Sequence, residues 1–160
     1  MFTDIVGFTA YTEVVGDEKA LAVLEAQTER TAAVLERWPE TRVVKELGDG
    51  LLIWCGGHDL GFHVAVDLLG ALCGEDDDDF PLSIRMGMHH GPVTPRGDDF
   101  VGHTVNVAAR LTDLAGPREL VVSEEVVDAC VDAADVDLRP VGPTTVKGVS
   151  AAIWLYRVAV

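Results

Sequence analysis

The sequence predicts a single α+β domain over residues 1–160, with paired strands and with helices packed mainly on one face of the sheet. Short apolar and β-branched runs predict the strands, and apolar residues at helical spacing predict the helices. A Gly48-Asp49-Gly50 turn between two apolar runs predicts a hairpin. A chain of 160 residues is long enough for one domain with its own core, and no repeat or linker divides it.

The first predicted strand covers residues 2–6 and carries Asp4 between apolar neighbours. A carboxylate in a buried strand is costly unless it is paired or bound to a metal ion, so we favour a metal ligand. The other interpretation is a cap for the helix that follows, although Asp4 precedes Gly7 and Thr9 is also placed to cap that helix. The strand is short for the centre of a sheet, which fits a fragment of a longer, multidomain protein.

A long amphipathic helix is predicted from Asp17 to Trp38, where Pro39 ends it. Its expected apolar stripe consists of Leu21, Leu24, Thr28, Thr31, Val34 and Leu35. The same patterns predict helices over residues 58–73 and 124–134, two hairpin strands within residues 41–55, and strands over residues 82–88, 119–123, 136–141 and 151–158.

Polar residues at two predicted strand ends allow more than one interpretation. Asp49 is either an ordinary turn residue, which is the commonest role of Asp there, or a second carboxylate beside Asp4. His89 and His90 follow the strand over residues 82–88, and we interpret them as structural rather than catalytic residues.

The segment from Asp99 to Arg110, DFVGHTVNVAAR, enters a helical pattern at Thr104. Asn106 and Arg110 are four residues apart and therefore point from the same face of that helix. A guanidinium suits phosphate oxygens, and an amide suits a sugar hydroxyl or ring oxygen. The alternative is a helix whose arginine simply pairs with a carboxylate.

The composition excludes several classes of protein. The net charge is −15, whereas a nucleic-acid surface needs a basic face, so any bound anion must be held by a few placed cations or by metal ions. No run approaches the ~18 apolar residues of a membrane span, and no signal peptide opens the chain, so we expect a cytoplasmic protein. Cys55, Cys73 and Cys130 lack metal-type spacing and fit reduced core residues.

Four segments, FTDIVGFT, KELGDG, DFVGHTVNVAAR and VKG, resemble the catalytic domain of class III nucleotidyl cyclases in their order and distances. The resemblance covers nearly the whole chain. It points to the short-armed bacterial subgroup, usually fused to regulatory modules, because the segment over residues 94–98 is shorter than the arm of many members. The family implies a ferredoxin-like βαββαβ core with additional C-terminal strands and a helix, and a head-to-tail homodimer with active sites in the interface.

The resemblance also implies a role for each matching residue. Asp4 and Asp49, with the backbone carbonyls of Ile5 and Val6, would hold two divalent cations per site, Mg²⁺ or Mn²⁺. Arg110 would stabilise charge on the α-phosphate in the transition state.

The remaining matching residues would bind the nucleotide. Asn106 would hold the ribose, and Lys147, in a loop over residues 144–148, would bind the terminal phosphates. Lys45 would donate to adenine N1 and Asp99 would accept from the N6 amino group, whereas guanine presents the reverse pattern.

The expected reaction is therefore the conversion of ATP to 3′,5′-cyclic AMP and pyrophosphate. Each active site would combine Asp4 and Asp49 of one subunit with the other five residues of its partner, so the monomer should be inactive. One alternative is a non-catalytic cyclase-like module that binds nucleotide or regulates by dimerising. Another is a diguanylate cyclase or palm-fold polymerase, which would require a Gly-Gly-Asp/Glu-Glu-Phe type of turn in place of LGDG.

Overall fold

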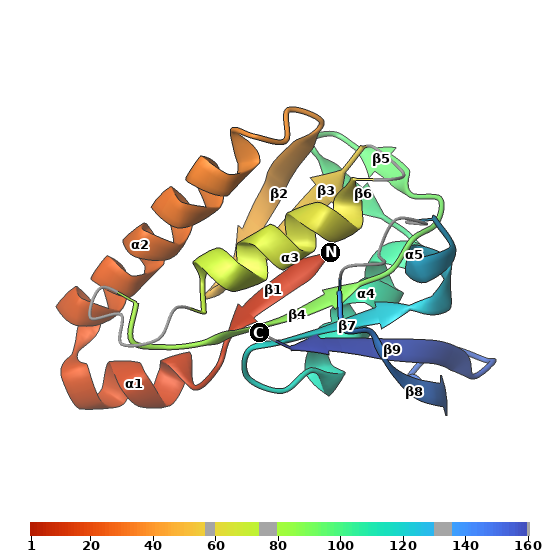
Figure 1. Ribbon diagram of the computed structural model, residues 1–160. Helices are drawn as coiled ribbons and strands as arrows, with labels where there is room; N and C mark the ends of the chain where they lie inside the picture. Colours follow the sequence, from red (N-terminus) through yellow and green to blue (C-terminus); the bar gives the residue numbers. More distant parts are fainter. Residues whose placement is uncertain (57–59, 74–79, 130–135, 160) are drawn as a thin grey trace.

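A seven-stranded sheet forms the centre of the computed structural model, which describes residues 1–56, 60–73, 80–129 and 136–159 (Figure 1). Its strands are β1 (Phe2–Ile5), β2 (Thr41–Leu47), β3 (Gly50–Cys55), β4 (Ile84–Met88), β7 (Glu119–Ser123), β8 (Arg139–Thr144) and β9 (Ile153–Ala159). A separate hairpin consists of β5 (Thr94–Arg96) and β6 (Asp99–Val101). The helices are α1 (Phe8–Val15), α2 (Asp17–Leu35), α3 (Gly61–Ala71), α4 (His103–Leu114) and α5 (Glu124–Ala129).

The strand order β2-β3-β1-β4-β7-β9-β8 confirms the predicted α+β class and its core. Chain order β1, α2, β2, β3, α3, β4 with spatial order β2-β3-β1-β4 is the ferredoxin-like βαββαβ arrangement. The strands β7, β9 and β8 extend the sheet beyond β4, and β4 pairs with β7 in parallel. The predicted hairpin is also confirmed, since β2 and β3 are antiparallel around the Gly48-Asp49 turn, with Leu47 opposite Gly50.

Helices α2 and α3 cover one face of the sheet, and α4 covers part of the opposite face (Figure 1). The position of α4 is the exception to the prediction that helices lie mainly on one face. It lies directly against β4 because Gly87 has no side chain. A Cβ on Gly87 would stand 2.2 Å from the backbone nitrogen of Thr112 and 2.6 Å from the carbonyl oxygen of Ala108. The larger core cluster lies under α2 and α3, and a smaller cluster that includes Val107 and Leu111 lies under α4.

The predicted apolar stripe of α2 is wrong in part: Thr31 and Val34 are buried as predicted, and Leu24 and Leu35 pack partly buried against the core. Leu21 is 55% exposed and Thr28 is also exposed. The buried residues are Ala20, Val23, Gln27, Thr31 and Val34. Gln27 explains this register, because its side-chain amide donates a 3.2 Å hydrogen bond to the carbonyl oxygen of Asp49 in the hairpin turn. A polar residue is thus buried in the core by a tertiary hydrogen bond, and the spacing of apolar residues does not predict its burial.

Other element ends differ from the predictions by a few residues. The helix predicted to reach Trp38 ends at Leu35, and Trp38 instead donates a hydrogen bond from its indole to Asp67 of α3. α1 begins after Gly7, which has a φ of 76° and serves as the N-cap, so Thr9 is not the cap.

The predicted ranges of two helices extend beyond the described residues. Residues 58–59 and 130–134 lie outside them, and the described parts are α3 and α5. The strand predicted over residues 136–141 is found later, as β8, because it pairs with β9 from Arg139 opposite Arg157 to Thr144 opposite Ile153.

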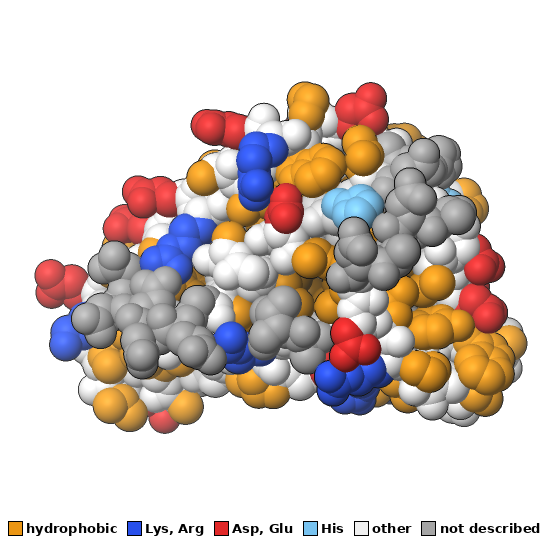
Figure 2. Space-filling model, in the orientation of Figure 1, with side chains coloured by type: hydrophobic (Ala, Val, Ile, Leu, Met, Phe, Trp, Pro, Cys, Tyr) orange, Lys and Arg blue, Asp and Glu red, His pale blue; other side chains and the backbone are white. Residues whose placement is uncertain are grey.

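The surface agrees with the acidic composition. On the face drawn in Figure 2, the Lys and Arg side chains are scattered among Asp and Glu and form no basic patch in the part of the chain that the structure describes. None of the described helices combines the length and apolar character of a membrane span.

Candidate active site

Asp4 and Asp49 lie next to each other, although 44 residues separate them in the sequence. Strand β1 pairs with β3, with Thr3 opposite Leu51, so the turn that carries Asp49 lies beside Asp4. Gly50 makes this approach possible. A Cβ on Gly50 would stand 2.6 Å from the carbonyl oxygen of Thr3 and 3.8 Å from Oδ1 of Asp4. The structure thus places Asp49 beside Asp4, and the role of Asp49 as a metal ligand stays a prediction.

The surroundings of Asp49 suit a cation. Burial raises the pKa of its carboxyl group, and the negative charge of Asp4 raises it further. Hydrogen bonds from its own backbone N–H and from that of Ile5, and the positive charge of Arg85, act in the opposite direction. A bound cation would relieve both the desolvation and the repulsion between the two carboxylates.

Arg85 is a site residue that we did not predict. It lies on β4 directly opposite Asp4, and its Nε and Nη2 atoms are both 2.7 Å from Oδ2 of Asp4. Both side chains are about one third exposed. The sequence does carry a signal for it, because Arg85 interrupts the apolar strand LSIRMGM just as Asp4 interrupts FTDIV.

The donor set fits magnesium or manganese. Two carboxylates and nearby backbone carbonyls offer the hard oxygen ligands that these ions take. Within the described residues, no group of three His, Cys, Asp or Glu side chains forms a more complete metal cluster. Asp4 and Asp49 would therefore hold the ions, and the contribution of the Ile5 carbonyl stays a prediction.

Lys45 and Asp99 form a second pair, with Nζ 2.5 Å from Oδ2. A β-bulge between Val43 and Lys45 turns the lysine to this side of the sheet, because the bulge shifts the register with β3 by one residue. The Lys45 hydrogen bond lowers the pKa of Asp99, and the backbone N–H of Phe100, 2.7 Å from Oδ1, lowers it further. Two residues that are 54 positions apart thus form one donor-and-acceptor unit.

The remaining predicted residues lie on the surface. Asn106 and Arg110 are on the exposed side of α4, opposite its buried residues, and Lys147 is exposed in the loop after β8. Arg110 forms a 3.3 Å ion pair with Asp113, as in the alternative interpretation of a helix arginine paired with a carboxylate. Among the described residues, no hydrogen bond or ion pair joins Asn106, Arg110 or Lys147 to Asp4 or Asp49.

His89 and His90, which follow β4, line a cavity and form neither of the two polar pairs. Nδ1 of His89 is 2.7 Å from the hydroxyl of Ser123, which agrees with a structural role. His89 and His90 line a mostly apolar cavity of about 310 Å³ that includes no predicted site residue. Trp54 and Phe100 also line this cavity.

Comparisons with known proteins identify the family of the chain. A sequence profile of the adenylate and guanylate cyclase catalytic domain matches residues 1–158. The chain is 31% identical over 160 residues to the pH-sensitive adenylate cyclase MT1302 of Mycobacterium tuberculosis, covering 98% of this chain and 39% of that protein. It is 37% identical over 121 residues to an adenylate cyclase of Streptomyces coelicolor, covering 76% of this chain and 30% of the relative. The chain therefore spans less than half of these relatives.

Solved structures confirm the fold. An adenylate cyclase of Trypanosoma brucei superposes with a TM-score of 0.86 at 20% identity, covering 98% of this chain and 85% of that one. Structurally similar proteins include both adenylyl and guanylyl cyclases. The family match excludes the diguanylate cyclase and polymerase interpretation, and it extends over nearly all of the sequence. The chain belongs to the family of adenylate and guanylate cyclase catalytic domains, the class III nucleotidyl cyclases.

Proposed function

We propose that this domain is an adenylate cyclase that converts ATP to 3′,5′-cyclic AMP and pyrophosphate. The observation that carries the proposal is that one cyclase fold contains two separate pairs of polar side chains. One is the carboxylate pair Asp4 and Asp49, and the other is the Lys45–Asp99 pair. The named adenylate cyclases among its relatives support the choice of reaction.

Two divalent cations held by Asp4 and Asp49 would lower the pKa of the ribose 3′-hydroxyl and neutralise the departing pyrophosphate. The 3′-oxygen forms a bond to the α-phosphorus, the bond between the α-phosphorus and the bridging oxygen breaks, and the hydroxyl proton is released. Arg110 donates to the α-phosphoryl oxygens, where a preorganised donor contributes most in the transition state. Asn106 holds the ribose and Lys147 binds the terminal phosphates.

Arg85 adds a phosphate-binding group. Its guanidinium now lies on Asp4, and a cation bound to Asp4 would free that guanidinium for the triphosphate. Guanidinium donors match phosphate oxygens in geometry and charge.

The Lys45–Asp99 pair supports adenine as the base. The ammonium donates to N1, and the carboxylate accepts from the N6 amino group. Guanine presents N1–H as a donor and O6 as an acceptor. The Lys45 ammonium would then face a donor and the Asp99 carboxylate would face an acceptor.

The domain acts as a head-to-tail homodimer in this proposal. Arg110 and Asn106 are exposed on α4 and do not contact the carboxylate pair of their own chain. A second copy could present them to that pair. Leu47, which is 46% exposed at the end of β2, offers apolar surface for such a contact.

We further propose a cytoplasmic location and control by a regulatory segment of a longer parent protein. The buried thiol of Cys73, which forms no disulfide, fits a reducing compartment. The relatives named above are more than twice as long as the chain.

The test is an assay of cyclic nucleotide formation at rising protein concentration, with ATP or GTP and Mn²⁺. Cyclic AMP that grows faster than linearly with protein, and disappears in Asp4→Ala, supports the proposal. Preferential formation of cyclic GMP contradicts the role of Lys45 and Asp99. Tight nucleotide binding without product would instead support the non-catalytic module.

A further inference from the structure

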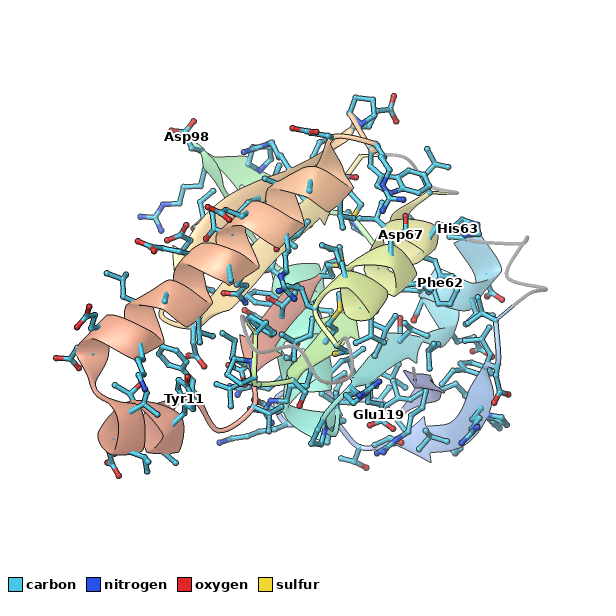
Figure 3. The ribbon with its side chains drawn as sticks, turned by 60° about the vertical axis from the view of Figure 1, so that its left-hand side comes forward. Tyr11, Phe62, His63, Asp67, Asp98 and Glu119 are labelled. Atoms are coloured by element: carbon cyan, nitrogen blue, oxygen red, sulfur yellow. The ribbon has the colours of Figure 1, made fainter. Side chains whose placement is uncertain are left out.

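Asp99 is not fixed by the main sheet. It lies on β6, which pairs with β5 in a separate two-stranded sheet. Figure 3 labels Asp98 at the tip of this hairpin, at the edge of the molecule. No backbone ladder of the described strands therefore sets the distance between Asp99 and Lys45, which lies on β2. The link through Gly102 to α4 and side-chain contacts must do so.

The main contact of this kind joins the residue after Asp99 to β3. The Phe100 ring stacks on the Trp54 ring, with centroids 5.5 Å apart and planes inclined by 27°. Such pairs have a preferred geometry, so they restrict the position of both partners. Because the Phe100 backbone N–H also donates to Oδ1 of Asp99, fixing Phe100 fixes the carboxylate.

Arg42 completes this contact from β2. Its guanidinium carbon lies 5.5 Å from the centroid of Phe100 and 5.9 Å from that of Trp54. Arg42 is directly opposite Trp54 in the β2–β3 pairing. The bulge after Val43 then places Lys45 on the same side of the sheet as Arg42. We call the three residues Arg42, Trp54 and Phe100 the aromatic clamp.

We propose that the aromatic clamp positions Asp99 against Lys45, with Trp54 as a positioning residue for base selection. The base-selection part rests on the proposed function. The ion pair alone joins two side chains that are each more than one third exposed, and such pairs constrain geometry weakly. The clamp adds a stacked ring pair and a cation over both rings, one residue from the carboxylate.

The test compares Trp54→Ala with Trp54→Phe, which keeps an aromatic ring. The control is Trp154→Ala, because Trp154 is 47% exposed on β9 and lies outside the clamp. Circular dichroism checks that each variant is folded. The first measurement follows the Asp99 carboxyl carbon by NMR during an acid titration, and it needs no nucleotide.

Loss of the clamp should let Asp99 move away from Lys45 and from the Phe100 N–H. Its pKa should then rise toward the ordinary range in Trp54→Ala, stay low in Trp154→Ala, and stay near the wild-type value in Trp54→Phe. An Asp99 pKa in folded Trp54→Ala as low as in the wild type would overturn the proposal.

The second measurement is the affinity for 3′-deoxyATP and 3′-deoxyGTP with Mn²⁺, since neither analogue has the hydroxyl needed for cyclisation. The preference for the adenine analogue should fall in Trp54→Ala by a factor on the order of threefold to tenfold. An undiminished preference would overturn the role of Trp54 in base selection. The wild type could bind both analogues equally while the Asp99 pKa is higher in Trp54→Ala than in the wild type. That result would refute adenine selection and would still support the positioning of Asp99 by the aromatic clamp.

Discussion

Arg85 and Asp4 form an ion pair in which two guanidinium nitrogens, Nε and Nη2, contact the same carboxylate oxygen at 2.7 Å. That oxygen belongs to a proposed metal ligand, so a guanidinium and a metal ion compete for it. The pair lies on neighbouring strands and its partners are directly opposite, so the sheet itself maintains the contact.

Replacing Arg85 by Gln should therefore have opposite effects on metal and nucleotide. Without the neighbouring positive charge, Mn²⁺ should bind to the nucleotide-free domain more tightly, by a factor on the order of threefold to tenfold. Nucleotide affinity and cyclase activity should fall, because a phosphate-binding group is lost. Calorimetry with Mn²⁺ alone and then with 3′-deoxyATP separates the two effects. Weaker Mn²⁺ binding in the variant would contradict the competition.

Asp49 should destabilise the metal-free fold at neutral pH. Its folded-state pKa is raised, mainly by burial, so the fold favours the protonated carboxyl group relative to the unfolded chain. The stability that comes from the protonated Asp49 carboxyl group is fully present below the unfolded-state pKa of 3.8. It is lost as pH rises through the raised folded-state pKa, so the ionised carboxylate destabilises the fold at neutral pH. Asp49→Asn should raise the melting temperature of the metal-free domain at pH 7 by about one to three degrees. The same variant should lose activity.

The metal affinity of the wild type should also fall as pH decreases through that raised pKa, because protons and cations compete for Asp49. Thermal melts with and without Mn²⁺ at several pH values measure both effects. A melting temperature of Asp49→Asn below that of the metal-free wild type at pH 7 would contradict the prediction that the ionised Asp49 carboxylate destabilises the metal-free fold.

Lys45→Ala should weaken the preference for ATP over GTP. It removes the donor to adenine N1 and leaves Asp99 without the hydrogen bond that lowers its pKa most. We expect kcat/KM for ATP to fall by about tenfold to a hundredfold, and that for GTP to fall less. The ratio of the two kcat/KM values is the decisive quantity. An equal fall in kcat/KM for ATP and for GTP would mean that Lys45 does not discriminate between the two bases.

Gln27 should stabilise the turn that carries Asp49. It is 2% exposed, and its amide bonds to the Asp49 carbonyl oxygen. Gln27→Leu removes this bond while keeping the side-chain volume similar, and should lower the free energy of unfolding by about 1–2 kcal/mol. Mn²⁺ binding should weaken as well, because the turn is less fixed. Thr28→Ala, on the exposed side of α2, is the control for metal binding and should leave the Mn²⁺ affinity unchanged. Unchanged Mn²⁺ affinity in Gln27→Leu would limit the role of Gln27 to stability.

Much of the fold could be predicted from local patterns. The Gly48-Asp49-Gly50 turn was visible because glycines flank an aspartate between apolar runs, and Gly48 indeed has a φ of 69°. The resemblance to a family supplied the order of the sheet, which no local pattern contains. Asp4 was recognised as unusual because a carboxylate interrupts an apolar strand.

The features that were missed depend on tertiary contacts. The stripe of α2 could be placed only in part, because Gln27 enters the core to bond the turn. The side of the sheet covered by α4 depends on the absence of a side chain at Gly87. We find no sequence pattern that predicts the bulge before Lys45. Arg85 interrupts an apolar strand, but its role follows only from its pairing with Asp4 in the sheet.

The most direct test of the account is complementation between two inactive variants. The central claim is that one subunit supplies Asp4 and Asp49 and its partner supplies Arg110. Asp4→Ala and Arg110→Ala should each be inactive alone, because every site in either homodimer lacks a residue. Mixed in equal amounts, they should form heterodimers with one intact site each, and activity should reach about one quarter of the wild-type value. A mixture as inactive as its parts, with heterodimers demonstrated by size and mass, would contradict the claim.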